Sequence, residues 1–156
     1  MKGNEKIIAI LNEFLADELT AISQYMVHSE MCANWGYDKL HEAVEKRAIG
    51  EMKHAEKLIA RILFLEGQPV VSHLNKMDIG ATVEAQLKHD LDAEAGAIKA
   101  YNDGIRLCLD LGDNGSRELI EDNLKDEEEH LDWLEAQLDQ INQMGLQNYL
   151  LAQVKE

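Results

Sequence analysis

Two Glu-x-x-His motifs are the groups in this chain best suited to chemistry: Glu51 with His54, and Glu127 with His130. Residues three apart on a helix share a face, so each motif would present a carboxylate and an imidazole side by side. Such a pair can ligate a metal ion. Because the chain has eighteen Glu and six His, about 0.7 such motifs are expected by chance, and the motifs alone are weak evidence.

Two further glutamates strengthen this interpretation through their spacing. Glu18 lies 33 residues before Glu51, and Glu94 lies 33 residues before Glu127. Given the two motifs, glutamate at both upstream positions has a chance probability of about one in a hundred. Neighbouring residues repeat with the same overall shift of 76: Ala21, Ile22 and Tyr25 recur as Ala97, Ile98 and Tyr101. The pattern indicates a duplicated helix pair.

The repeat defines a candidate metal centre of six residues: Glu18, Glu51, His54, Glu94, Glu127 and His130. Four carboxylates buried together would repel one another unless protons or cations neutralise them. Two divalent ions balance four carboxylates, and mixed oxygen and nitrogen ligation favours iron or manganese, although zinc could also bind. The pattern matches the known ligand set of di-iron and di-manganese carboxylate bundles, with Glu51 and Glu127 best placed to bridge. The competing interpretation is that these are solvated glutamates of an acidic protein.

Long amphipathic segments are predicted to carry these residues. Apolar residues recur at helical spacing over 5–34, 38–65, 82–111 and 116–144, with a short fifth segment over 146–154. The stretch from Gly67 to Ala81 is long enough to run the length of a bundle. We therefore predict an all-α fold: an antiparallel four-helix bundle with one long crossover, as in ferritin-like bundles, over 1–145, and a short C-terminal helix over 146–156.

Composition excludes several classes of protein. Fifteen basic against thirty acidic residues give a net charge of −15, which repels nucleic acid and anionic membranes and attracts cations. No stretch approaches the length of a membrane span, and no signal peptide is evident. Cys32 and Cys108 are isolated thiols, as expected in a reducing compartment. We expect a cytoplasmic protein that binds neither nucleic acid nor membrane.

Along its whole length the chain closely resembles the bacterioferritin family, the haem-containing ferritins of bacteria. The segments that carry the resemblance are 51–55, 61–67, 126–135 and 144–152. The resemblance implies iron storage and detoxification: a ferroxidase centre with two irons per subunit oxidises Fe²⁺ with oxygen or peroxide and delivers Fe³⁺ to a mineral core. It also implies a homo-oligomeric shell of 24 subunits built from twofold dimers, and a ferredoxin-type redox partner for iron release.

The same resemblance implies haem b at the subunit dimer interface, held by a methionine from each subunit, and Met52 occupies that position. Met52 follows Glu51 by one residue and so points about 100° away from the metal face. It joins Ile49, Ile59 and Leu63 in a second apolar stripe. A helix that is apolar on two sides must bury the second side, and a twofold partner would cover it. Without the resemblance, packing is the commoner role for such a methionine.

Several positions leave alternatives open. Where some relatives place a histidine and an aspartate that bind iron on the inner surface, this chain has Lys46 and Gly50, so we expect that accessory site to be missing. Tyr25 and Tyr101 are either core residues or hydrogen-bond donors and radical-prone neighbours of the metals. Two further acidic residues could orient a histidine: Asp90 and Asp126. The last segment either packs near a fourfold axis of the shell or docks on its own bundle.

Two other functions compete with iron storage. A peroxide-reducing di-iron protein of the rubrerythrin kind usually carries a four-cysteine iron site, which two scattered cysteines cannot build. The second is a haem-binding or structural shell whose di-metal site is inert.

Overall fold

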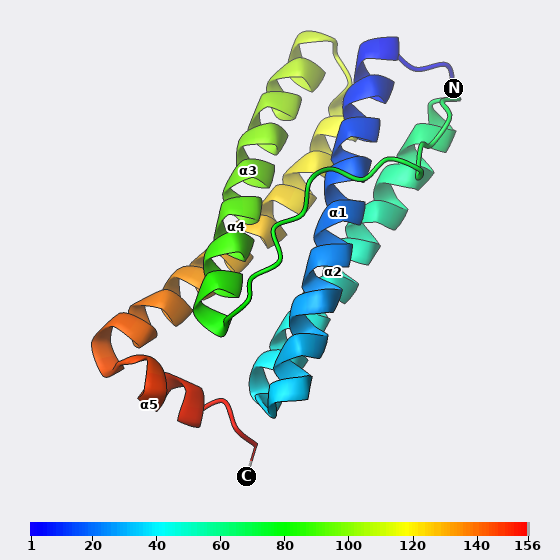
Figure 1. Ribbon diagram of the computed structural model, residues 1–156. Helices are drawn as coiled ribbons and strands as arrows, with labels where there is room; N and C mark the ends of the chain where they lie inside the picture. Colours follow the sequence, from blue (N-terminus) through cyan, green and yellow to red (C-terminus); the bar gives the residue numbers. More distant parts are fainter. Residues whose placement is uncertain (156) are drawn as a thin grey trace.

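The computed structural model describes residues 1–155 and contains four long helices and one short helix (Figure 1). The helices are α1 (Glu5–Trp35), α2 (Asp38–Phe64), α3 (Val83–Asp110), α4 (Asn114–Met144) and α5 (Leu146–Leu151). The described residues form no strand. The predicted all-α bundle with a short fifth helix is therefore confirmed, and none of these helices is long and apolar enough to cross a membrane.

The fifth helix is shorter than the predicted 146–154. After Leu151 the chain closes into a turn in which Gln153 N donates to the Leu150 carbonyl, three residues back instead of four. The Gln153 carbonyl in turn accepts from Lys39 N at the start of α2, at 3.1 Å, so the end of the chain is drawn away from a helical path. Glu156, the last residue of the predicted segment 146–156, lies outside the described residues.

Local signals set the ends of the long helices. Asn4, Thr82 and Asp113 precede α1, α3 and α4, and each side chain accepts a hydrogen bond from a backbone N–H of the first turn. α1 ends at Trp35 and is capped by Gly36, whose φ of 85° is left-handed and costs glycine no side-chain clash. The chain then reverses within a few residues into α2.

The two helical hairpins, α1 with α2 and α3 with α4, lie side by side, with α1 against α3 and α2 against α4. The crossover over 65–82 runs along the outside of α1 to the far end of the bundle, as its length predicted (Figure 1). Three backbone N–H groups of the crossover donate to side chains on successive turns of α1: Asn75 to Thr20, Asp78 to Gln24 and Gly80 to His28. The crossover is thus fixed over the groove between α1 and α3.

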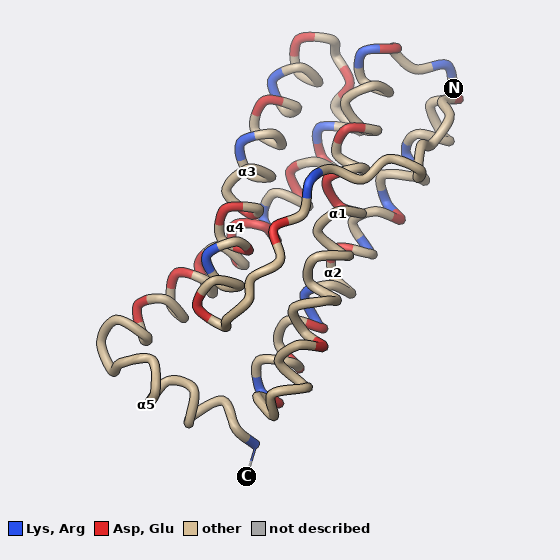
Figure 2. Tube along the Cα trace, viewed as in Figure 1, with Lys and Arg blue, Asp and Glu red and all other residues tan. Residues whose placement is uncertain are grey.

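Two apolar clusters occupy the ends of the bundle interior. One includes Leu11, Leu58 and Ile62, and the other includes Leu87 and Leu134. Each fully buried side chain of this size contributes about 1.5–3 kcal/mol, which offsets the cost of burying polar groups. Acidic residues lie along all four long helices, whereas α5 carries no charge (Figure 2). Between the two clusters lie the buried polar side chains of the interior, beside a small third apolar cluster formed by Tyr25, Val44 and Ala48.

Candidate metal centre

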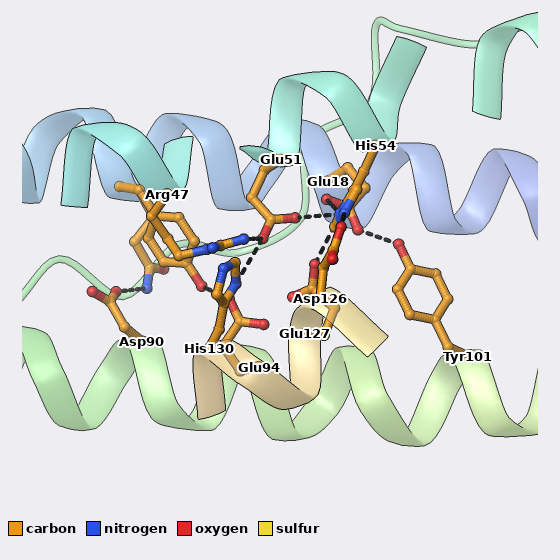
Figure 3. A network of polar contacts seen from close by, with 12 residues as sticks. Glu18, Arg47, Glu51, His54, Asp90, Glu94, Tyr101, Asp126, Glu127 and His130 are labelled. Atoms are coloured by element: carbon orange, nitrogen blue, oxygen red, sulfur yellow. Dashed lines mark hydrogen bonds and ion pairs between the residues drawn. The ribbon is translucent and has the colours of Figure 1, made fainter. Parts of the chain in front are cut away.

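The six predicted ligands meet in this polar region (Figure 3). One glutamate comes from each of α1 and α3, and a Glu-x-x-His motif comes from each of α2 and α4. No member is more than 7 % exposed. The structure therefore brings together the complete set: Glu18, Glu51, His54, Glu94, Glu127 and His130.

The six residues form two overlapping groups of four. The first group is Glu18, Glu51, His54 and Glu127, and the second is Glu51, Glu94, Glu127 and His130. Within each group, one ligand atom from every residue lies within 4.8 Å of the others. Each group offers three carboxylates and one imidazole to one cation, and Glu51 and Glu127 belong to both groups. This is the arrangement expected of two cations bridged by shared carboxylates.

The two oxygens of Glu51 point towards different histidines. Glu51 Oε2 lies 3.2 Å from His54 Nδ1, whereas Glu51 Oε1 lies 3.5 Å from His130 Nδ1. Glu127 Oε1 lies 2.9 Å from His54 Nδ1. Both histidines therefore turn the same ring nitrogen, Nδ1, towards the carboxylates.

Several buried atoms of the centre have no hydrogen-bond partner. They include Glu18 Oε2, Glu94 Oε2 and His130 Nδ1. A buried polar atom without a partner costs about 1–3 kcal/mol, and more if it is charged. Oxygen and nitrogen atoms that converge in this way suit divalent cations that accept mixed ligands, such as iron, manganese or zinc.

In the absence of cations, three of the four carboxylates of the centre have raised pKa values and hold protons more tightly than usual: Glu18, Glu94 and Glu127. Burial raises the pKa of Glu94 to about 7, and burial together with the hydrogen bond to Glu94 raises that of Glu127 to about 12. Burial and the adjacent Glu51 raise the pKa of Glu18 well above its ordinary value. Burial opposes ionisation of Glu51, but hydrogen bonds from Glu18, His54 and Glu127 lower its pKa to about 2. Protons thus occupy the place that cations would take.

Two buried tyrosines donate hydrogen bonds to the centre. The Tyr25 hydroxyl donates to Glu94 Oε1, and the Tyr101 hydroxyl donates to Glu18 Oε1. Burial and these carboxylates raise the pKa of both hydroxyls, so both remain protonated donors. Of the two roles open from the sequence, the structure shows that of hydrogen-bond donor to a carboxylate of the candidate centre.

The two aspartates that could orient a histidine have different partners. Asp126 Oδ2 lies 2.8 Å from His54 Nε2, on the side of the ring away from the centre. Asp90 instead lies 2.9 Å from Nδ1 of His28, which is not one of the six residues. His28 accepts a hydrogen bond from Gly80 N in the crossover, so Asp90 contacts a residue that fixes the crossover, whereas Asp126 contacts one of the six residues of the candidate centre.

A cavity of about 360 Å³ leads to the centre between α1 and α3, beneath the crossover. Its inner wall includes Glu18 and Glu94, and acidic residues Asp17, Asp78 and Asp92 line it farther out. The sequence did not reveal this opening, because its walls come from three segments far apart in the chain.

Sequence reasoning also missed Arg47. Its Nη2 lies 3.4 Å from Glu51 Oε1, and its guanidinium reaches the centre from α2 (Figure 3). The available signal was its position four residues before Glu51, which places the two side chains on one helix face.

Comparison with known proteins identifies the family of this chain. The ferritin-like domain family matches residues 8–144. Bacterioferritin of Rhodobacter capsulatus is 42 % identical over 151 residues, which cover 97 % of this chain and 94 % of the relative. Bacterioferritin of Mycobacterium leprae is 39 % identical (96 % and 94 % covered), and a bacterial ferritin of Synechocystis is 41 % identical (99 % of both). The chain belongs to the bacterioferritin family of ferritin-like proteins.

Proposed function

We propose that this protein stores iron, and that its buried centre is a ferroxidase that oxidises Fe²⁺ to Fe³⁺. The observation that carries the proposal is the pair of overlapping ligand groups that share Glu51 and Glu127. Membership of the bacterioferritin family supports iron as the metal. The six residues proposed to bind iron are Glu18, Glu51, His54, Glu94, Glu127 and His130.

The charges of the centre suit two Fe²⁺ substrates. Four carboxylates balance two divalent ions, and Glu51 and Glu127, which belong to both groups, would contribute to both positions. The arriving cations displace the protons held by Glu94 and Glu127. Two Fe²⁺ then supply two electrons in total. With two protons these reduce oxygen to hydrogen peroxide, or peroxide to two waters.

The cavity between α1 and α3 is the proposed path for Fe²⁺. Asp17, Asp78 and Asp92 would attract the cation at the outside, and the four carboxylates of the centre would receive it. Because salt screens the attraction between exposed carboxylates and a cation, added salt should slow the entry of Fe²⁺.

Haem b and the shell form the second part of the proposal. Met52 is 45 % exposed, and Ile49 and Leu63 on the same helix are also exposed, so this chain alone leaves these apolar side chains uncovered. A second subunit on a twofold axis would cover them, and haem b would lie between the two Met52 side chains. Twelve such dimers would form the 24-subunit cytoplasmic shell around a ferric mineral, with a ferredoxin-type partner for iron release.

Ferrous oxidation in air tests the centre. Glu51→Gln and Glu127→Gln keep the side-chain volume and remove ligand charge, so each should lower the rapid oxidation rate at least about 100-fold. Glu128→Gln changes the exposed neighbour of Glu127 and should leave the rate unchanged. Wild-type rates in the two ligand variants would exclude the ferroxidase assignment. Stoichiometric iron binding without turnover in the wild type would indicate an inert centre.

Two measurements test the haem and the shell. Met52→Leu should abolish the haem absorbance of the purified protein, whereas Met144→Leu, another exposed methionine, should retain it. Unchanged haem absorbance in Met52→Leu would remove Met52 as the ligand. Size-exclusion chromatography should give a particle of 24 subunits, and a stable monomer or dimer would exclude the shell.

A further inference from the structure

Arg47 is the one basic side chain other than histidine that contacts the six ligands in the described part of the chain. It lies on α2 one turn before Glu51, and 23 % of its side chain is exposed. Its Nε is buried and has no hydrogen-bond partner, so the guanidinium is only partly satisfied. Arginine remains charged at every pH at which the protein is folded. The centre therefore has a permanent positive charge beside it.

Gly50 leaves room for this guanidinium. A Cβ atom at Gly50 would lie 3.1 Å from Arg47 Nη2, which is closer than ordinary van der Waals contact. A larger residue at position 50 would have to displace the end of the arginine side chain. The absence of a side chain at Gly50 is thus coupled to the position of Arg47.

Arg47 contacts the oxygen of Glu51 that belongs to one of the two metal positions. Glu51 Oε1 lies 3.4 Å from Arg47 Nη2 and 3.5 Å from His130 Nδ1. The other oxygen, Oε2, faces His54. A cation in the group that contains His130 must therefore share Oε1 with a fixed positive charge, whereas a cation in the group that contains His54 uses Oε2.

We propose that Arg47 is a positioning residue that makes the two metal positions unequal. It holds Glu51 Oε1 and weakens cation binding beside His130, so the position beside His54 fills first. This inference rests on the proposed metal centre and specifies the order in which it is loaded. Because Arg47 is partly exposed and screened, we expect its charge to weaken the second binding step about tenfold.

Titration of the apoprotein with Co²⁺ tests the order of loading without any redox reaction. Calorimetry and the visible absorbance of bound Co²⁺ should show a tight step followed by a weak step. His54→Ala should remove the tight step, and His130→Ala should remove the weak one. Arg47→Gln should tighten the weak step about tenfold and leave the tight step within about threefold.

Two further variants separate charge from packing. Arg47→Lys keeps the charge and should retain the unequal steps, while Lys46→Gln removes the same charge from an exposed neighbour and should change neither step. An unchanged weak step in Arg47→Gln, or equal tightening of both steps, would overturn the role of Arg47.

The two proposals fail differently. If wild-type apoprotein binds no Co²⁺, the metal centre is wrong, and the role of Arg47 is overturned with it. If it binds two Co²⁺ with equal affinity and still oxidises Fe²⁺ rapidly, only the role of Arg47 is overturned.

Discussion

The Asp126 carboxylate lies 2.8 Å from Nε2 of His54 and determines which nitrogen of that ring faces the metal centre. An ionised carboxylate only accepts hydrogen bonds, so it keeps a proton on Nε2. Nδ1 is then the nitrogen that can give up its proton and bind a cation. Asp126 is 48 % exposed, and it can be replaced at little cost to the core.

Replacing Asp126 by Ala should weaken Co²⁺ binding about tenfold. Without this carboxylate the His54 ring is less basic, and its orientation is no longer fixed. The loss should appear in the step assigned to His54, measured by calorimetry of the apoprotein. Asp122→Ala, one turn earlier on α4 and also exposed, is the matched control. Equal effects of the two substitutions would show that only surface charge is involved.

Replacing Tyr25 by Phe should shift metal binding to higher pH. The hydrogen bond from Tyr25 lowers the pKa of Glu94, which burial raises to about 7. Without the hydroxyl this pKa rises further, so a cation must displace a more tightly held proton. The pH midpoint of Co²⁺ binding measures the change.

Tyr149→Phe is the control for the loss of a buried hydroxyl. Tyr149 donates to Gln137 Oε1 at 2.7 Å, and neither residue contacts the centre. This substitution should cost about 1 kcal/mol of unfolding free energy and leave the pH midpoint unchanged. A shift of equal size in both variants would contradict the role of Tyr25.

The apoprotein should lose stability as pH rises. The pKa of Glu94 is about 7 in the folded protein against an ordinary value of 4.5, so the folded state binds more protons between these values. Glu94 alone should therefore lower the free energy of unfolding by up to about 3 kcal/mol between pH 4.5 and 7, and Glu18 and Glu127, whose pKa values are also raised, act in the same direction. Burial lowers the pKa of His54, but hydrogen bonds to carboxylates outweigh burial and raise this pKa. The fall in the free energy of unfolding therefore continues above pH 6.5.

Urea unfolding in EDTA at pH 5 and pH 8 measures this dependence. Glu94→Gln cannot ionise and should reduce the difference between the two pH values. Stability that increases with pH in the wild-type apoprotein would contradict the proton-filled centre.

Replacing Gly80 by Ala should loosen the crossover. A Cβ atom there would lie 2.3 Å from the backbone N of Gln86, which cannot move without distorting α3. We expect a loss of about 1–3 kcal/mol, measured by urea unfolding. Gly96→Ala places the same methyl group where nothing lies within 4 Å and should stabilise α3 by about 0.5–1 kcal/mol. Equal effects at the two positions would exclude the steric explanation.

The four long helices, the crossover and the six residues of the centre could be predicted from the sequence. Helical periodicity depends on neighbours along the chain, and the repeated spacing of Glu18, Glu51 and His54 is a property of the sequence itself. Both patterns can be recognised without knowing which helices contact one another. The end of α5 could not be predicted, because a contact with Lys39 on another helix decides it.

The partners of the outer residues were decided by the tertiary structure. Tyr25 follows Glu18 on α1 but donates to Glu94 on α3, and Tyr101 follows Glu94 but donates to Glu18. Each tyrosine lies seven residues, or about 10 Å, along the helix from the glutamate of its own helix. The facing helix of the bundle presents its glutamate directly opposite that tyrosine. Sequence thus determined which residues lie at this level of the bundle. Only the packing of helices against one another decided which glutamate each tyrosine hydroxyl contacts.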